Sequence, residues 1–154
     1  MTDILTDDTC LRLERLIAAP PALLFELCTD PSEVVKWWAP DGYRASVDVL
    51  DLRVGGRWRI VLHGADGRDS AMAGAFRVIE PPHRLAYTWT WEAPHPAAGD
   101  VTEVEMTFEA APGGTRLTLV HRNFADATIC KRHVAGWTAS LDRLGALASE
   151  RSPS

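Results

Sequence analysis

Residues 131–150 read KRHVAGWTASLDRLGALASE, and this stretch decides the fold that the sequence predicts. Its apolar side chains recur at intervals of three and four residues, which places them on one face of an α-helix. These side chains are Val134, Trp137, Leu141, Leu144 and Ala148. Lys131, Asp142 and Arg143 fall on the opposite face. We therefore expect one long amphipathic helix from about residue 128 to 149.

The middle of this helix contains a glycine, Gly136, directly before the large Trp137. A glycine in a helix interior costs about 1 kcal/mol relative to alanine, so its presence needs a reason. Two interpretations stay open. Gly136 allows a neighbouring backbone or a ligand to approach closely, or it relieves a steric conflict while Trp137 fills the centre of the core.

Residues 44–122, which precede the helix, show the two-residue alternation of β-strands. Five turn signals, VGG, GADGRD, EPPHR, APHPAAGD and APGG, divide this region into about six strands. One face of each strand is apolar and the other polar, which is typical of an antiparallel sheet. The expected inward positions of four strands are Trp58, Ile60 and Leu62; Leu85, Tyr87, Trp89 and Trp91; Val104, Met106 and Phe108; and Leu117, Leu119 and His121.

Two hairpins have a register that the alternation predicts, because apolar residues should pair with apolar residues. The predicted pairs are Phe108–Leu117, Met106–Leu119, Val104–His121 and Glu109–Arg116 around APGG, and Phe76–Tyr87 and Gly74–Trp89 around EPPHR. A small residue facing a large one is expected to keep space on a curved concave surface.

The N-terminal part begins with a strand at residues 10–19, CLRLERLIAA, followed by a helix in residues 20–29, PPALLFELCT. A second short helix follows, with Asp30 as its N-cap and Glu33 as the capping-box partner. Pro40 ends it.

The order of elements is therefore a strand, two short helices, six strands and a long helix. The economical packing is an α+β fold, in which a bent antiparallel sheet of about seven strands wraps around the C-terminal helix. The short helices close one end. We expect a single domain over residues 8–149, with the first seven residues and the tail ERSPS frayed.

This order resembles the helix-grip fold of the START and birch-pollen-allergen superfamily. Five stretches, RLIAAPPALLFELCTDPSEVVKWWAP, DLRVGGRWRI, GAFRVIEPPHRLAYTW, GGTRLTLVHRNF and GWTASLDRL, are similar to the family named after the activator of the heat-shock-protein-90 ATPase. The resemblance covers residues 10–148 and implies a pocket between the sheet and the long helix. The superfamily includes lipid and hormone binders, polyketide cyclases and co-chaperone domains, so the fold alone does not decide the activity. The co-chaperone also depends on a separate N-terminal domain, for which we see no counterpart in this sequence.

The composition excludes several classes of partner. The chain has 154 residues, 46% of them hydrophobic and 24% charged, and a net charge of −5, which disfavours nucleic-acid binding. No signal peptide is recognisable, and no apolar stretch approaches the roughly 20 residues of a membrane span. Cys10, Cys28 and Cys130 lack the spacing of a disulfide framework. We expect a cytoplasmic protein without a membrane partner.

Catalytic groups are sparse in this sequence. The histidines lack metal-ligand spacing, so neither a metal site nor a cofactor is expected. His121 shares the inward parity of Leu117 and Leu119. It is either a proton donor or acceptor in the cavity or a strand-end histidine bonded to the adjacent loop. Whether the protein is an enzyme stays open.

The inward aromatic faces predict an apolar cavity in which a few polar groups orient a small ligand. Tyr87, His121 and the tryptophan N–H groups would supply the hydrogen bonds. The predicted lining residues are Trp38, Trp58, Phe76, Tyr87, Trp89, Met106, Leu119, His121 and Trp137.

Binding of a small hydrophobic or aromatic molecule is the function that this pattern favours. Two alternatives stay open: a cyclase- or hydrolase-like enzyme in which His121 or Tyr87 transfers a proton, and a chaperone-related protein-interaction module. A homodimer is compatible with the sequence, which contains nothing that requires one.

Overall fold

An antiparallel sheet of eight strands and three helices make up the part of the chain that the structure describes, residues 2–6 and 9–151 of a computed structural model. The elements in chain order are β1 (Thr2–Thr6), β2 (Cys10–Ile17), α1 (Pro21–Thr29), α2 (Pro31–Val34), β3 (Tyr43–Leu50), β4 (Arg57–Gly64), β5 (Asp69–Glu80), β6 (Arg84–Trp91), β7 (Val101–Ala111), β8 (Gly114–Arg122) and α3 (Ala127–Arg151).

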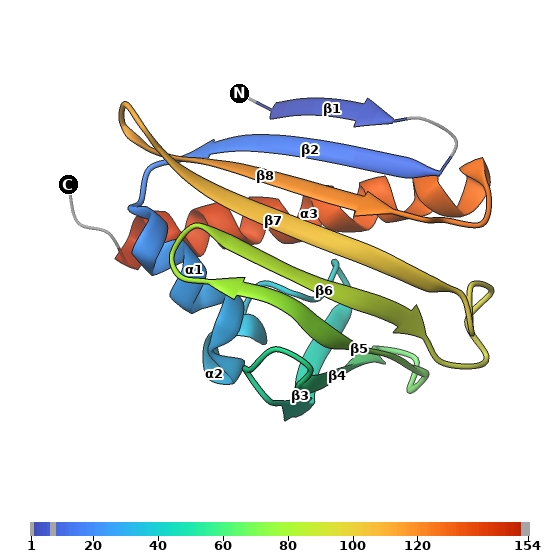
Figure 1. The fold of residues 1–154 in the computed structure, drawn as a ribbon. Helices are drawn as coiled ribbons and strands as arrows, with labels where there is room; N and C mark the ends of the chain where they lie inside the picture. The colour runs from blue at the N-terminus through green and yellow to red at the C-terminus, as the bar shows by residue number, and fades with distance from the viewer. Residues whose placement is uncertain (1, 7–8, 152–154) are drawn as a thin grey trace.

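The strands follow the order β1-β2-β8-β7-β6-β5-β4-β3, so β2 lies beside β8 from the other end of the chain. Helix α3 runs along the back of the sheet, and α1 and α2 lie at one end (Figure 1). The predicted helix-grip arrangement, with six strands between the short helices and the long one, is confirmed.

The two ends of the chain are more ordered than the sequence indicates. Strand β1 was expected to be frayed, yet it pairs with β2 from Thr2–Arg15 to Thr6–Leu11. It thereby satisfies backbone groups that the outer edge of β2 would leave unpaired. Helix α3 also continues into the predicted tail as far as Arg151. Residues 1, 7 and 152–154 of the expected frayed ends lie outside the described residues.

The predicted register of the APGG hairpin is confirmed at all four pairs, including the ion pair of Glu109 with Arg116. The EPPHR hairpin contains the predicted Phe76–Tyr87 pair. Beside it, a Cβ atom on Gly74 would lie 1.8 Å from the carbonyl oxygen of Thr88. Gly74 is therefore required by close backbone contact.

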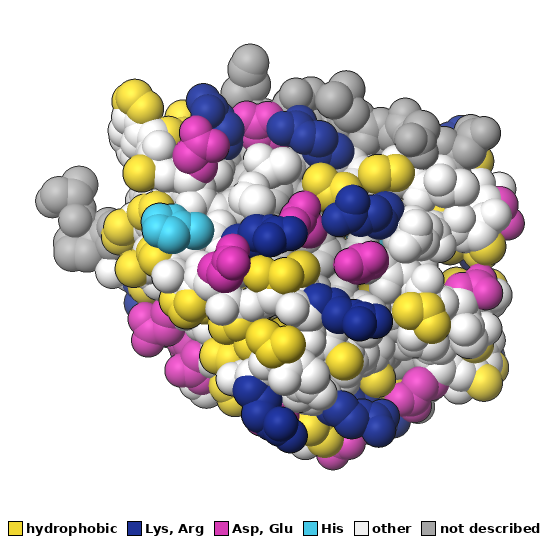
Figure 2. Space-filling model, viewed as in Figure 1, with side chains coloured by type: hydrophobic (Ala, Val, Ile, Leu, Met, Phe, Trp, Pro, Cys, Tyr) yellow, Lys and Arg dark blue, Asp and Glu magenta, His cyan; other side chains and the backbone are white. Residues whose placement is uncertain are grey.

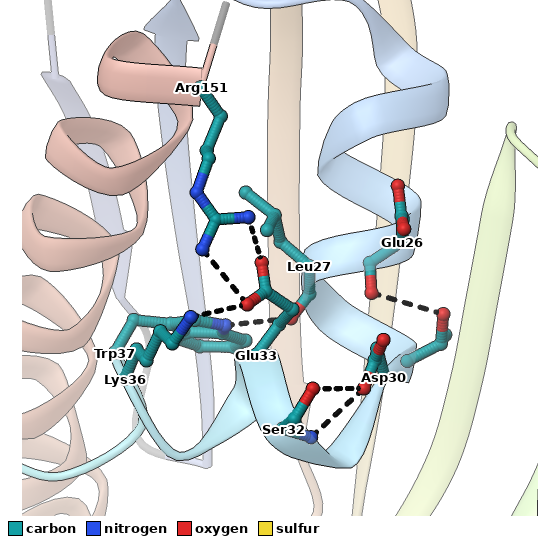
Figure 3. Close-up of polar contacts among 9 residues, drawn as sticks. Glu26, Leu27, Asp30, Ser32, Glu33, Lys36, Trp37 and Arg151 are labelled. Atoms are coloured by element: carbon teal, nitrogen blue, oxygen red, sulfur yellow. Dashed lines mark hydrogen bonds and ion pairs between the residues drawn. The ribbon is translucent and has the colours of Figure 1, made fainter.

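Helix α2 begins as predicted, because the carboxylate of Asp30 accepts a hydrogen bond from the Ser32 N–H at 2.9 Å (Figure 3). The predicted capping-box role of Glu33 is wrong. Its carboxylate instead pairs with Lys36 at 2.6 Å and with the two terminal guanidinium nitrogens of Arg151 at 2.5 and 3.0 Å. These contacts attach the end of α3 to α2 and lower the pKa of Glu33.

The core lies between the concave face of the sheet and α3. The predicted inward side chains of β4, β6, β7 and β8 are buried, except that Trp91 is half-buried. On α3, Trp137, Leu141, Leu144 and Ala148 are buried as predicted. Val134 is only half-buried, because His133 occupies the inward position and bonds to Trp91 of β6.

The other face of the sheet carries basic and acidic side chains interspersed with one another (Figure 2). Ion pairs cross the strands here, such as Arg84–Glu105 between β6 and β7 and Arg116–Glu14 between β8 and β2. No helix of the described residues is long and apolar enough to cross a membrane.

Candidate functional site

A partly open cavity of about 140 Å³ lies between β4, β5 and β6 of the sheet and the first half of α3. We call it the tryptophan cavity. Its lining residues are Trp38, Pro40, Leu62, Met72, Trp89, Trp91, His95, Arg132, His133, Gly136, Trp137 and Ser140.

Four of the six tryptophans line this cavity. The rings of Trp38 and Trp89 are stacked, with centroids 5.3 Å apart, and Trp137 lies against both at 5.7 and 5.5 Å. The edges and faces of these rings make a rigid apolar surface. Such a surface suits an aromatic or aliphatic group.

The indole N–H groups of these tryptophans differ in what they bind. The indole of Trp38 donates to the sulfur of Met72 at 3.4 Å, and that of Trp91 donates to Nε2 of His133 at 2.8 Å. The buried Nε1 of Trp89 has no partner among the described residues. Because a buried donor without a partner is costly, this one is a candidate to meet a ligand or a water molecule.

Two polar side chains stand at the more exposed rim of the tryptophan cavity, His95 and Arg132. The ring of His95 lies parallel to Trp91, with centroids 3.9 Å apart, and its Nδ1 accepts the Ala97 N–H at 3.0 Å. Burial, followed by the nearby His133 and Arg132, lowers the pKa of His95 to about 4. The ring is therefore neutral at pH 7, and its proton is on Nε2.

His121 is part of a chain of three hydrogen bonds that runs from the indole of Trp137 to the carbonyl oxygen of Trp89. Nδ1 of His121 accepts the indole N–H of Trp137 at 3.0 Å, so the ring proton is on Nε2 and is donated to the hydroxyl of Thr102 at 2.7 Å. That hydroxyl donates to the carbonyl oxygen of Trp89 at 2.9 Å. Burial holds the pKa of His121 well below its usual range. Both ring nitrogens are thus engaged.

A second, smaller cavity of about 20 Å³ shares Trp38 with the tryptophan cavity. Its lining residues are Cys28, Val34, Trp37, Trp38, Leu50, Trp58, Ile60, Phe76, Tyr87 and Met106. The buried hydroxyl of Tyr87 has no hydrogen-bond partner within the described ranges. Burial raises the pKa of Tyr87 and of Cys28. The space is about enough for one water molecule.

The predicted site residues are divided among three places. Trp38, Trp89 and Trp137 line the tryptophan cavity. Trp58, Phe76, Tyr87 and Met106, with Trp38 again, line the second cavity. Leu119 and His121 belong to neither lining and are fully buried.

The prediction missed the contribution of α3 to the rim. Arg132, Gly136 and Ser140 are spaced four residues apart and all line the tryptophan cavity. A Cβ atom on Gly136 would meet nothing within 4 Å, so the close approach of a neighbouring backbone and the relief of a steric conflict, both left open by the sequence, are wrong. The helical spacing on either side of Gly136 was the signal that could have identified Arg132.

The described residues contain no group of three His, Cys, Asp or Glu side chains that could hold a metal ion. His133 is also committed, because its Nδ1 bonds to the carbonyl oxygen of Ile129 at 2.8 Å and its Nε2 accepts from Trp91. The arrangement therefore presents aromatic surface, one unpaired indole donor and a polar rim.

Residues 18–149 match the family model described as Activator of Hsp90 ATPase homolog 1-like protein. Among solved structures, the AHSA1 protein from Silicibacter pomeroyi is 31% identical, with a TM-score of 0.83 over 92% of this chain and 99% of that one. A protein from Chromobacterium violaceum is 28% identical, with a TM-score of 0.84 over 91% and 97% of the two chains. One from Mycobacterium smegmatis is 26% identical, with a TM-score of 0.81 over 96% of each. A comparison with curated proteins finds no match.

Proposed function

Because the chain belongs to the family of Activator of Hsp90 ATPase homolog 1-like proteins, we propose that it binds a small apolar or aromatic molecule in the tryptophan cavity. The fold of this family is consistent with ligand-binding and with chaperone-related roles. The observation that carries the proposal is the apolar cavity, whose lining includes Trp89, a residue with a buried and unpaired indole N–H.

The size of the cavity supports a ligand with one ring. A cavity of about 150 Å³ lined by apolar side chains is large enough to bind benzene. The tryptophan cavity, at about 140 Å³, is similar, and it is open on one side. The ring of a ligand would stack among the indoles while a polar substituent meets Trp89 or the rim.

The hydrogen bonds and pKa shifts of His121 and Tyr87, the two side chains considered for proton transfer, favour binding over catalysis. His121 uses both ring nitrogens in hydrogen bonds, and its pKa is low. Tyr87 lines the second cavity, and its pKa is raised. Neither group is therefore prepared to exchange a proton with a molecule in the tryptophan cavity.

Isothermal titration calorimetry with indole and toluene tests this proposal. The variant Gly136→Leu should fill the cavity, because there is open space beside Gly136, and should remove the response. Ala135→Leu places the same side chain at the adjacent exposed position of α3 and should respond like the wild type. The proposal fails if the wild type does not respond to either compound, or if Gly136→Leu responds as the wild type does.

A further inference from the structure

We propose that the tryptophan cavity selects small aromatic carboxylates, with the ring among the tryptophans and the carboxylate at the rim between Arg132 and His95. This inference rests on the proposed function and adds the charge of the ligand to it. Its basis is the distribution of charge around the cavity, which differs from that of the whole chain.

Arg132 is the one permanently charged side chain in the lining, which contains no carboxylate. It is exposed on α3, and no ion pair joins it to any residue within ranges 2–6 and 9–151. The guanidinium is free to turn toward a bound anion, and its two parallel N–H groups match the two oxygens of a carboxylate.

His95 adds a neutral donor beside this charge. Its tautomer is fixed by the Ala97 N–H at Nδ1, which leaves the proton on Nε2, and its position is fixed by the stack on Trp91. No described residue accepts a hydrogen bond from Nε2. An N–H donor and a guanidinium side by side can both donate hydrogen bonds to an anion, whereas neither group can accept one from a cation.

Two acidic side chains that follow lining residues directly in the sequence are already engaged. Asp41, which follows Pro40, is paired with Arg143. Glu92, which follows Trp91, forms two hydrogen bonds of 2.9 Å with Arg59. The net charge of −5 on the chain opposes anions only weakly at the rim, because charges more than about 10 Å away are screened at 0.1 M salt.

The division of the cavity into an apolar interior and a cationic rim also sets the shape of the ligand. A ring fills a volume of about 140 Å³, so the acidic group has to project toward Arg132. Phenylacetate has this form, and phenylacetamide has the same shape without the charge. The pair isolates the contribution of the carboxylate.

Isothermal titration calorimetry with these two compounds tests the proposal. We expect the wild type to bind phenylacetate about fivefold more tightly than phenylacetamide, because an ion pair exposed to solvent changes a dissociation constant by about this factor. Arg132→Gln should remove this preference, because it should weaken the binding of phenylacetate more than that of phenylacetamide. Lys131→Gln removes the same charge one residue away, outside the cavity lining, and should keep the preference.

Four results would overturn the proposal. Equal or tighter binding of phenylacetamide shows that the rim does not select anions. If Lys131→Gln loses the preference as fully as Arg132→Gln does, the net charge of the protein, and not contact with Arg132, causes it. Binding of indole or toluene without binding of phenylacetate refutes the carboxylate and leaves the proposed function standing. If none of the four compounds binds to the wild type, both proposals fail.

Discussion

Replacing Trp137 by phenylalanine should destabilise the fold mainly through a lost hydrogen bond. The variant keeps an aromatic ring on α3 but removes the indole N–H that bonds to Nδ1 of His121. His121 is fully buried, so that nitrogen would lose its partner where water cannot replace it. An unsatisfied buried acceptor costs about 1–3 kcal/mol, and the smaller ring adds about 1 kcal/mol for lost packing. We expect a total near 3 kcal/mol.

Urea unfolding, followed by circular dichroism at pH 7, measures this loss. Trp38→Phe is the matched control, because it removes the same atoms from a buried indole whose N–H meets only the weakly accepting sulfur of Met72. Its cost should be smaller by about 1–2 kcal/mol.

A double-mutant cycle separates the hydrogen bond from the packing. In the variant that combines Trp137→Phe with His121→Leu, neither partner is left unsatisfied, so its cost should fall below the sum of the single costs by about 1–2 kcal/mol. Additive costs, or a Trp137→Phe variant no less stable than Trp38→Phe, would refute the assignment of this bond.

Three further predictions follow from single side chains. Burial lowers the pKa of His121, so as the pH falls the unfolded chain binds a proton at this residue before the folded protein does, and the free energy of unfolding should decrease. Urea midpoints measured from pH 7 to 5 should fall less steeply in His121→Leu than in the wild type. Gly74→Ala should lower the free energy of unfolding by about 3 kcal/mol, since its Cβ would collide with a carbonyl oxygen, whereas Gly136→Ala should raise it by about 0.5–1 kcal/mol; thermal unfolding of both variants checks this contrast. Glu33→Gln should cost about 1 kcal/mol at pH 7 through lost pairing with Arg151, and this cost should disappear in urea titrations as the pH falls through the lowered pKa of Glu33.

Each of these three has an outcome that contradicts it. Parallel pH profiles for the wild type and His121→Leu would exclude His121 as a source of the acid sensitivity. Equal effects at Gly74 and Gly136 would mean that helix and strand propensity, not contact with the backbone, decides both. A Glu33→Gln cost that stays constant down to pH 3 would remove the carboxylate charge from the explanation.

The regular part of the fold was predictable because its signals are local. Alternation along β7 and β8, together with a turn between them, was enough to pair Phe108 with Leu117 and Glu109 with Arg116. The same parity identified the tryptophans of the wall. It could not show where facing side chains pack solidly and where they leave space, which is why Leu119 was predicted at a cavity that it does not line.

The errors arose where a distant partner decides the position of a side chain. His133 faces inward because Trp91 supplies a hydrogen bond from another element, and hydropathy alone favours Val134 in that place. Glu33 fits a capping box by its spacing, but Arg151 binds it from the far end of the chain. From the sequence, Arg132 is expected to be a solvent-exposed residue of the helix, and only the folded structure shows that it lies near His95.

The position of β2 between β1 and β8 has a consequence for synthesis of the chain. Leu11 cannot reach its partner His121 until the ribosome has made most of the protein, although the hairpins from β3 to β7 can form earlier from neighbouring residues. Helix α3, which covers the tryptophans, is made later still. The growing chain therefore carries an uncovered aromatic surface until its last helix leaves the ribosome, and this interval is when it is most exposed to aggregation.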